Sequence, residues 1–120
     1  MPKSTRQPRA ALVPLSMCFL LAAASPALAE PDPWWAQDKA LHFSACFMLA
    51  GDGYATAAVL SKNRFHRLFA GFGAALAVGA AKEAYDSRSG GDASWRDMTW
   101  DMVGGATGTA ISWLIDRYLF

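Results

Sequence analysis

Eight ionisable residues stand in three separate parts of the chain, each group at helical spacing. They are Asp38, Lys39, His42, Lys82, Glu83, Asp86, Asp97 and Asp101. One imidazole among several carboxylates suits a hard or borderline divalent cation, and it also suits acid–base chemistry centred on His42. The metal-ligand candidates in this set are His42, Glu83, Asp86 and Asp97. The alternative is a network of salt bridges that holds helices in register.

Several other chemistries are excluded by missing motifs and by composition. The sequence contains no G-x-S-x-G elbow, no Walker A loop and no C-x-x-C pair. Eleven basic and ten acidic residues give a formal charge of +1, so the chain lacks the basic excess of a nucleic-acid binder. Catalytic residues therefore stay unassigned, and no cofactor is predicted beyond the divalent-metal alternative.

Residues 1–29 have the features of a secretory signal peptide. Lys3, Arg6 and Arg9 precede an apolar run over 12–24, and an A-L-A sequence ends at residue 29. We expect cleavage after that alanine. A retained membrane anchor is the alternative, although the apolar run is shorter than the ~20 residues of a spanning helix.

Cys18 offers a different processing route, because residues 15–18 loosely resemble a bacterial lipobox. Met17 departs from that pattern, since small residues normally precede the modified cysteine. Lipidation at Cys18 is therefore kept as an alternative. Cleavage after residue 29 would leave Cys46 without an internal disulfide partner, and we expect it to pack as a small hydrophobe.

Three helices are predicted after an extended lead-in over 30–37 that is rich in Pro and Trp. They span 38–61, 64–85 and 94–119. Two glycines make 51–53 a weak point of the first helix, and Ser and Gly predict a loop over 86–92. Ser94 followed by Asp97 predicts a capping-box start for the third helix.

Short connections make neighbouring helices antiparallel, so the eight ionisable residues are expected to gather at one end of a bundle. The periodicity also predicts which face of each helix turns inward. On the first helix the expected stripe carries Asp38, His42, Asp52 and Thr56. Small residues line the expected faces of the other two, namely Gly71, Ala75 and Gly79 on the second and Gly104 and Gly108 on the third.

The residue types of these helices favour membrane association. Hydrophobic residues make up 53% of the chain, and helix contacts rich in Gly and Ala are common in membranes. The charge-free stretches 68–81 and 102–115 are shorter than a spanning helix normally requires. The alternative is close packing in a soluble bundle. Trp34 and Trp35 suit either a bilayer interface or a lid over the core.

The motifs are D-K-x-x-H-F from Asp38, K-E-x-x-D from Lys82, and S-x-x-D-x-x-x-D-x-x-G-x-x-x-G from Ser94. Together they resemble the YfiM-like family of predicted bacterial periplasmic or envelope lipoproteins, over about residues 36–110. That resemblance marks the same eight ionisable positions and implies no activity. A distant similarity to VanZ-like membrane proteins rests on the first motif and on an Asp before a Gly-rich helix. Asp101 departs from it, because those proteins tend to have Asn there.

We therefore expect an all-α protein, a small membrane-associated bundle of three main helices running up, down and up after an N-terminal signal peptide. The expected location is the periplasmic side of the bacterial cell envelope. The expected role is that of a structural or accessory factor. The alternative is a metal-binding or hydrolytic enzyme acting on an envelope lipid or glycan precursor. Membrane lipid or envelope components are the expected partners, nucleic acid is not, and no protein partner is identified.

Overall fold

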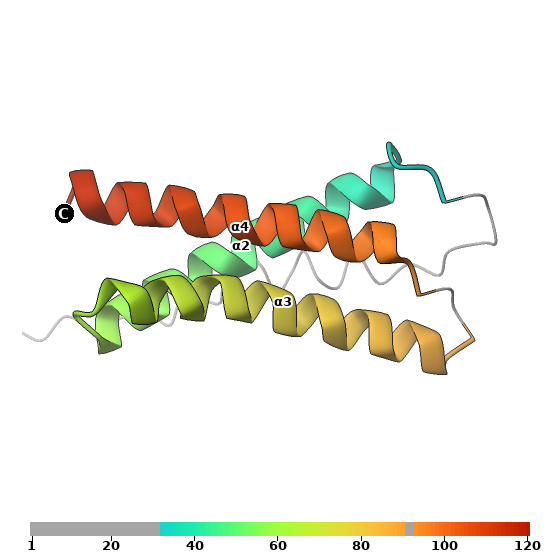
Figure 1. The fold of residues 1–120 in the computed structure, drawn as a ribbon, viewed down its shortest axis with the longest axis horizontal. Helices are drawn as coiled ribbons and strands as arrows, with labels where there is room; N and C mark the ends of the chain where they lie inside the picture. The colour runs from blue at the N-terminus through green and yellow to red at the C-terminus, as the bar shows by residue number, and fades with distance from the viewer. Residues whose placement is uncertain (1–31, 91–92) are drawn as a thin grey trace, which may run out of the picture.

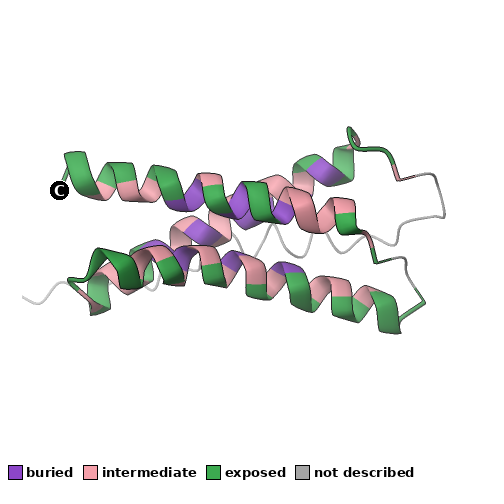
Figure 2. Cartoon of the chain, viewed as in Figure 1, coloured by how far each residue is buried: buried purple, intermediate pink, exposed green. Residues whose placement is uncertain are grey.

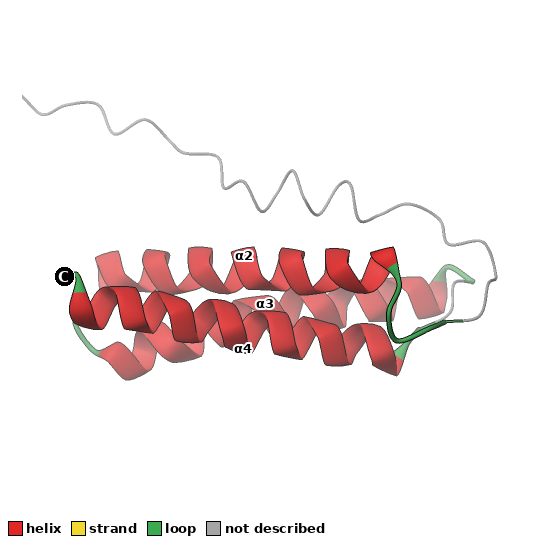
Figure 3. Ribbon diagram, turned by 90° about the horizontal axis from the view of Figure 1, so that it is seen from above, coloured by secondary structure: helices red, strands yellow, loops and turns green. Residues whose placement is uncertain are grey.

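The computed structural model describes residues 32–90 and 93–120, and this part of the chain forms three long helices. α2 spans Gln37–Leu60, α3 spans Arg64–Arg88 and α4 spans Trp95–Tyr118. They lie side by side, and their connections lie at alternate ends (Figures 1 and 3). The all-α prediction of three helices running up, down and up is confirmed. The predicted signal peptide and Cys18 lie outside the described residues.

Side-chain caps begin α3 and α4, as helix N-termini require. Asn63 accepts a hydrogen bond from the Phe65 N–H at 2.9 Å, and Ser94 Oγ accepts one from the Asp97 N–H at 3.4 Å. The predicted loop is wrong at its start, because α3 continues to Arg88. A Lys82–Asp86 ion pair supports this last turn, and the chain leaves the helix before Gly90, whose φ is +78°.

Glycines let the helices approach one another closely. A Cβ added to Gly104 would lie 2.2 Å from the Phe43 carbonyl oxygen, and one added to Gly108 would lie 2.3 Å from that of Phe47. Both residues are buried on the predicted face of α4. The predicted weak point at 51–53 stays helical, because Gly53 serves packing instead: its Cβ would lie 2.7 Å from a carbonyl oxygen of α3.

The inward face of α2 is rotated slightly from the predicted stripe. The buried residues of α2 are Lys39, His42, Ala45, Cys46, Ala50 and Tyr54. Thr56 is exposed and Asp52 is half-buried, so these two polar residues do not define the inner face. The stripe was misplaced because it followed polar residues, whereas Cys46 and Ala50, with Ala75 of α3, form the small apolar core.

Many large apolar side chains point outward. Among the exposed ones are Val59, Leu60, Phe65, Phe69, Met102, Val103, Ile111, Leu114 and Ile115. Buried positions are confined to narrow inner stripes, while the outer faces of the helices are open (Figure 2). Within the described residues, α2 is long and apolar enough to cross a bilayer, a property shared by core helices of soluble proteins.

Candidate functional site

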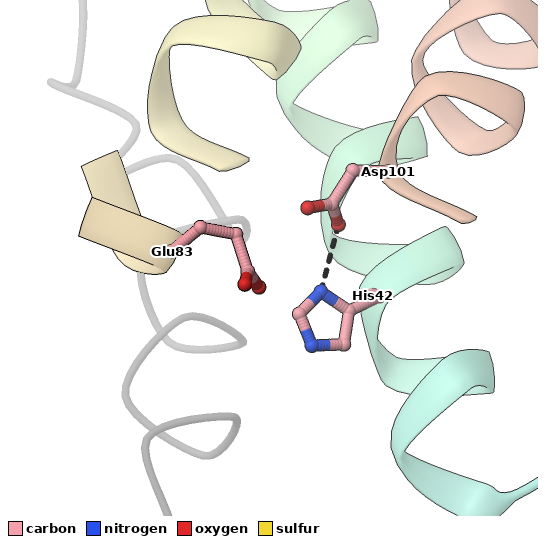
Figure 4. Close-up of side chains that lie close together, drawn as sticks. All are labelled: His42, Glu83 and Asp101. Atoms are coloured by element: carbon pink, nitrogen blue, oxygen red, sulfur yellow. Dashed lines mark hydrogen bonds and ion pairs between the residues drawn. The ribbon is translucent and has the colours of Figure 1, made fainter. Parts of the chain in front are cut away.

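Four ionisable side chains meet between the first two turns of α2 and the first two turns of α4. Asp97 contacts the Lys39 ammonium with Oδ1, and its Oδ2 lies 3.3 Å from His42 Nε2. The other ring nitrogen, His42 Nδ1, lies 2.8 Å from Asp101 Oδ1 (Figure 4). The Cys46 thiol donates to the same Asp101 oxygen at 3.3 Å. Along this series of contacts, cations of α2 alternate with carboxylates of α4.

We use the name His42 cluster for Lys39, His42, Glu83, Asp97 and Asp101. Its centre is almost free of solvent, with Lys39 2% exposed and Asp101 1% exposed. Burying such charges is costly unless each finds a partner of opposite sign. The alternation of cations and carboxylates provides those partners for Lys39 and His42.

Contacts within the cluster raise the pKa of His42 and lower the pKa of Asp97. Burial alone would lower the pKa of His42, but the hydrogen bonds to Asp101 and Asp97 outweigh burial and raise that pKa to about 9. Burial alone would raise the pKa of Asp97, but the hydrogen bonds with His42 and Lys39 bring it down to about 2. Burial raises the pKa of the Cys46 thiol to about 12, helped by the charge of Asp101, so this thiol is a poor nucleophile at neutral pH.

α3 brings three predicted residues to the same end of the bundle. Glu83 Oε2 accepts the backbone N–H of Ser94 at 2.8 Å, so an acid from another helix fills the capping-box position predicted for Asp97. Burial raises the pKa of Glu83. Lys82 and Asp86 bond to each other at 2.7 Å, and that bond raises the pKa of Lys82 against the effect of burial.

Lys39 has further partners at the edge of the cluster. Its ammonium contacts Asp38 at 2.6 Å and also contacts Asp32, which in turn accepts from the Ser94 hydroxyl. Bonds with Lys39 and Ser94 lower the pKa of Asp32. Asp32 was missed by sequence reasoning, because it stands between two prolines in the lead-in. The three carboxylates of Asp32, Asp38 and Asp97 lie close enough together for a metal site, but Lys39 already contacts each of them.

Aromatic rings cover the outside of this end. Trp34 packs edge-on against Trp95 with ring centroids 4.8 Å apart, and Trp35 packs against Trp100 at 5.4 Å. The Arg96 guanidinium lies 5.4 Å from the Trp34 ring centroid. Both tryptophans therefore pack against aromatic rings of α4, while Trp35 remains 85% exposed.

A second cluster, not predicted from the sequence, lies at the opposite end. Asp116 accepts from the Tyr54 hydroxyl at 2.8 Å, and both of its oxygens contact Arg67 at 2.8 Å. Arg64 Nε lies 3.4 Å from Asp116. We call Tyr54, Arg64, Arg67 and Asp116 the Asp116 cluster. The bond with Tyr54, followed by the arginines, lowers the pKa of Asp116.

Comparison of the chain with protein-family models, with curated proteins and with solved structures yields no match. The interpretation of the site therefore depends on its geometry. That geometry brings together Lys39, His42, Asp97 and Asp101, places Glu83 beside them, and leaves Asp38 exposed at the margin. Such a buried, paired arrangement can fix helix register, and it offers carboxylate and imidazole ligands.

Proposed function

We propose that the chain is a structural or accessory factor of the bacterial cell envelope, exported and associated with membrane on the periplasmic side. Its resemblance to YfiM-like lipoproteins supports that placement. The observation that carries the proposal is the reversed distribution of side chains. Charged pairs and mostly small residues, with Tyr54, are buried in the interior, whereas many large apolar residues are exposed.

The outward apolar residues support lipid as the surrounding medium. Single exposed apolar residues are common in soluble proteins, but extended exposed apolar surface marks an interaction site. Here Phe65, Phe69, Ile111 and Leu114 are all exposed, and the interior contains no comparable apolar mass among the described residues. Lipid would cover this surface while the helices keep their polar contacts inside.

The His42 cluster supports a structural role. Its contacts join α2 to α4 through two carboxylates that stand one helical turn apart, so a shift of either helix along the other would break several ion pairs together. Lys39 and both nitrogens of His42 are engaged by these carboxylates. A structural role requires only the ion pairs that these groups already form.

Fractionation tests membrane association. The native protein is followed through separated periplasmic and membrane fractions, and the membrane fraction is then washed with alkaline carbonate. We expect the protein in the membrane fraction, and intact mass reports cleavage after Ala29 or lipidation at Cys18. Recovery of the protein in the soluble periplasmic fraction would overturn the proposed membrane association.

Asp97→Ala, expressed from the native locus, tests the structural role. We expect melting temperature, abundance and any phenotype of a deletion strain to change together, because the substitution leaves Lys39 and His42 short of a partner. A full deletion phenotype at undiminished abundance and melting temperature would contradict a structural role and favour a chemical one.

A further inference from the structure

Three carboxylate oxygens of the His42 cluster are buried without a hydrogen-bond partner among the described residues: Asp97 Oδ1, Glu83 Oε1 and Asp101 Oδ2. Asp97 Oδ1 contacts the Lys39 ammonium as an ion pair, which leaves Glu83 Oε1 on α3 and Asp101 Oδ2 on α4. The second oxygen of each group is used, by the Ser94 N–H for Glu83 and by His42 for Asp101. An unsatisfied buried acceptor costs about 1–3 kcal/mol, and more when it is charged. The two free oxygens therefore favour a ligand that the described side chains do not supply.

The geometry around these oxygens fits one ion. Glu83, Asp101 and His42 each offer a ligand atom, and the three atoms lie within 4.8 Å of one another. Ligands at ~2.0–2.2 Å from a cation lie at most about 4.4 Å apart, so only small side-chain movements are required. Figure 4 shows the three side chains converging, each from a different helix. A cavity of about 20 Å³ borders His42 and Asp101, but Glu83 does not line it, so the cavity adjoins these three side chains without enclosing the point between them.

The charges at the site favour a cation. Lys39 is shared by Asp32, Asp38 and Asp97. Lys82 also borders the cavity, but its ammonium is bonded to Asp86 at 2.7 Å. In the part of the chain that the structure describes, Glu83 takes part in none of the ion pairs. An added cation would supply a cationic partner to Glu83 and a second one to the Asp101 carboxylate.

We infer that Glu83, Asp101 and His42 bind one divalent transition-metal cation, of the class that includes Zn²⁺ and Mn²⁺. One imidazole nitrogen with two carboxylate oxygens is a ligand set that these borderline cations accept. Because a ligating imidazole is neutral, His42 gives up one ring proton and one of its two carboxylate contacts when the cation binds. This ligand set differs from the one predicted from the sequence, because it contains Asp101 in place of Asp86 and Asp97. The inference goes beyond the structural role and does not depend on membrane association.

Calorimetric titration of the full chain tests this site. The protein is purified in detergent, stripped with EDTA, dialysed and titrated with Zn²⁺ and, separately, with Mn²⁺. Glu83→Gln removes one ligand charge, yet its amide oxygen can still accept the Ser94 N–H. We expect this variant to lose affinity by about tenfold or more. Asp86→Asn is the matched control, because Asp86 stands three residues along the same helix and bonds to Lys82, and we expect it to keep wild-type affinity.

Two further measurements keep the test decisive. Thermal unfolding of metal-free Glu83→Gln establishes that the variant is folded, and X-ray absorption of the wild-type Zn²⁺ form reports its ligands directly. One imidazole with carboxylate oxygens around the zinc supports the site. Equal affinity of wild type and Glu83→Gln, or a zinc spectrum without an imidazole ligand, would overturn it. Either negative result leaves the proposed structural role intact, because the Lys39–Asp97 ion pair involves none of the three proposed ligands.

Discussion

The two ends of the bundle both join helices through ion pairs, but they bury those pairs to different degrees. In the His42 cluster, Lys39 and Asp101 are 2% and 1% exposed. In the Asp116 cluster, the side chains of Asp116 and Arg64 are 17% and 49% exposed. Both clusters combine carboxylates with cations from other helices. The second is the more open to water because of Arg64, although Tyr54 is 3% exposed and the Arg67 side chain, at 13%, is no more exposed than that of Asp97.

This difference predicts different roles for the two ends. Removing one partner of a buried ion pair leaves an uncompensated charge in the protein interior, whereas water readily solvates a charge left at the surface. We therefore expect the His42 cluster to set the register of α4 against α2. The Asp116 cluster should tolerate substitution better, since Arg64 is half exposed and Arg67 keeps its hydrogen bond to the Ser61 carbonyl oxygen when Asp116 is lost.

The largest expected effect comes from Asp97→Ala. It leaves Lys39 and His42 buried with fewer carboxylates, and we expect a loss of about 3–5 kcal/mol in the free energy of unfolding. Chemical denaturation in detergent measures the loss. Maleimide labelling of buried Cys46, in a Cys18→Ser background, should also accelerate. Asp116→Ala is the corresponding substitution at the other end. Equal losses of unfolding free energy from the two substitutions would contradict the different roles predicted for the two clusters.

The pH dependence of stability provides the next test. The pKa of His42 rises from 6.5 to about 9 on folding, so its contribution is complete below pH 6.5 and disappears as pH rises through 9. At order of magnitude it amounts to about 3 kcal/mol. The pKa of Asp97 falls from 3.8 to about 2, so its contribution is present above pH 3.8 and disappears as pH falls through 2.

Unfolding free energies measured in EDTA across this range check the prediction. We expect a plateau between the two limits, and His42→Gln should remove most of the alkaline decline. His66→Gln serves as control, because His66 is an exposed residue near the other end. An alkaline decline that persists unchanged in His42→Gln would show that another group causes it.

Helix spacing gives a smaller contrast. Gly104→Ala would place a methyl carbon 2.2 Å from the Phe43 carbonyl oxygen, and we expect overpacking to cost about 1–3 kcal/mol. The methyl group of Gly51→Ala would contact only the Ser112 hydroxyl, at 3.7 Å. Because alanine has the higher helix propensity, we expect this substitution to leave stability unchanged or to raise it slightly. Thermal unfolding compares the pair. A Gly104→Ala protein as stable as wild type would mean that α2 and α4 can separate at little cost.

Tyr54→Phe should have the smallest effect. It removes one hydrogen bond to Asp116, whose contacts with Arg67 remain, so we expect a loss of about 1 kcal/mol or less. Denaturant unfolding of Tyr54→Phe and Asp97→Ala under the same conditions compares the stability lost at the two ends. A loss as large as that of Asp97→Ala would mean that the Asp116 cluster, and not only the His42 cluster, fixes helix register.

Much of the fold and part of the site could be predicted from local pattern and topology. The spacing of Gly71, Ala75 and Gly79 identified the inner face of α3, and all three are buried. Antiparallel connections brought Lys39 and His42 to Asp97 and Asp101, residues almost sixty positions away. These predictions succeeded because helix period and short loops leave few arrangements open.

Other contacts depend on details that spacing does not encode. Asp32 reaches Lys39 from a non-helical segment, where no periodicity applies. Tyr54 and Asp116 are 62 residues apart and belong to no motif. The free oxygens of Glu83 and Asp101 become visible only when each hydrogen bond is assigned to an atom. Side-chain rotamers and close helix contacts decide such features, and a single sequence does not specify them.

The ion pairs between α2 and α4 can form only after both helices have been synthesised. His42 is synthesised 59 residues before Asp101, an interval of roughly 3–12 s at ordinary rates of translation. Both carboxylates that contact its ring belong to α4. During that interval the hairpin of α2 and α3 carries an imidazole without either of those acids. α4 leaves the ribosome after α2 and α3, and it supplies the carboxylates that complete the interior beside α2.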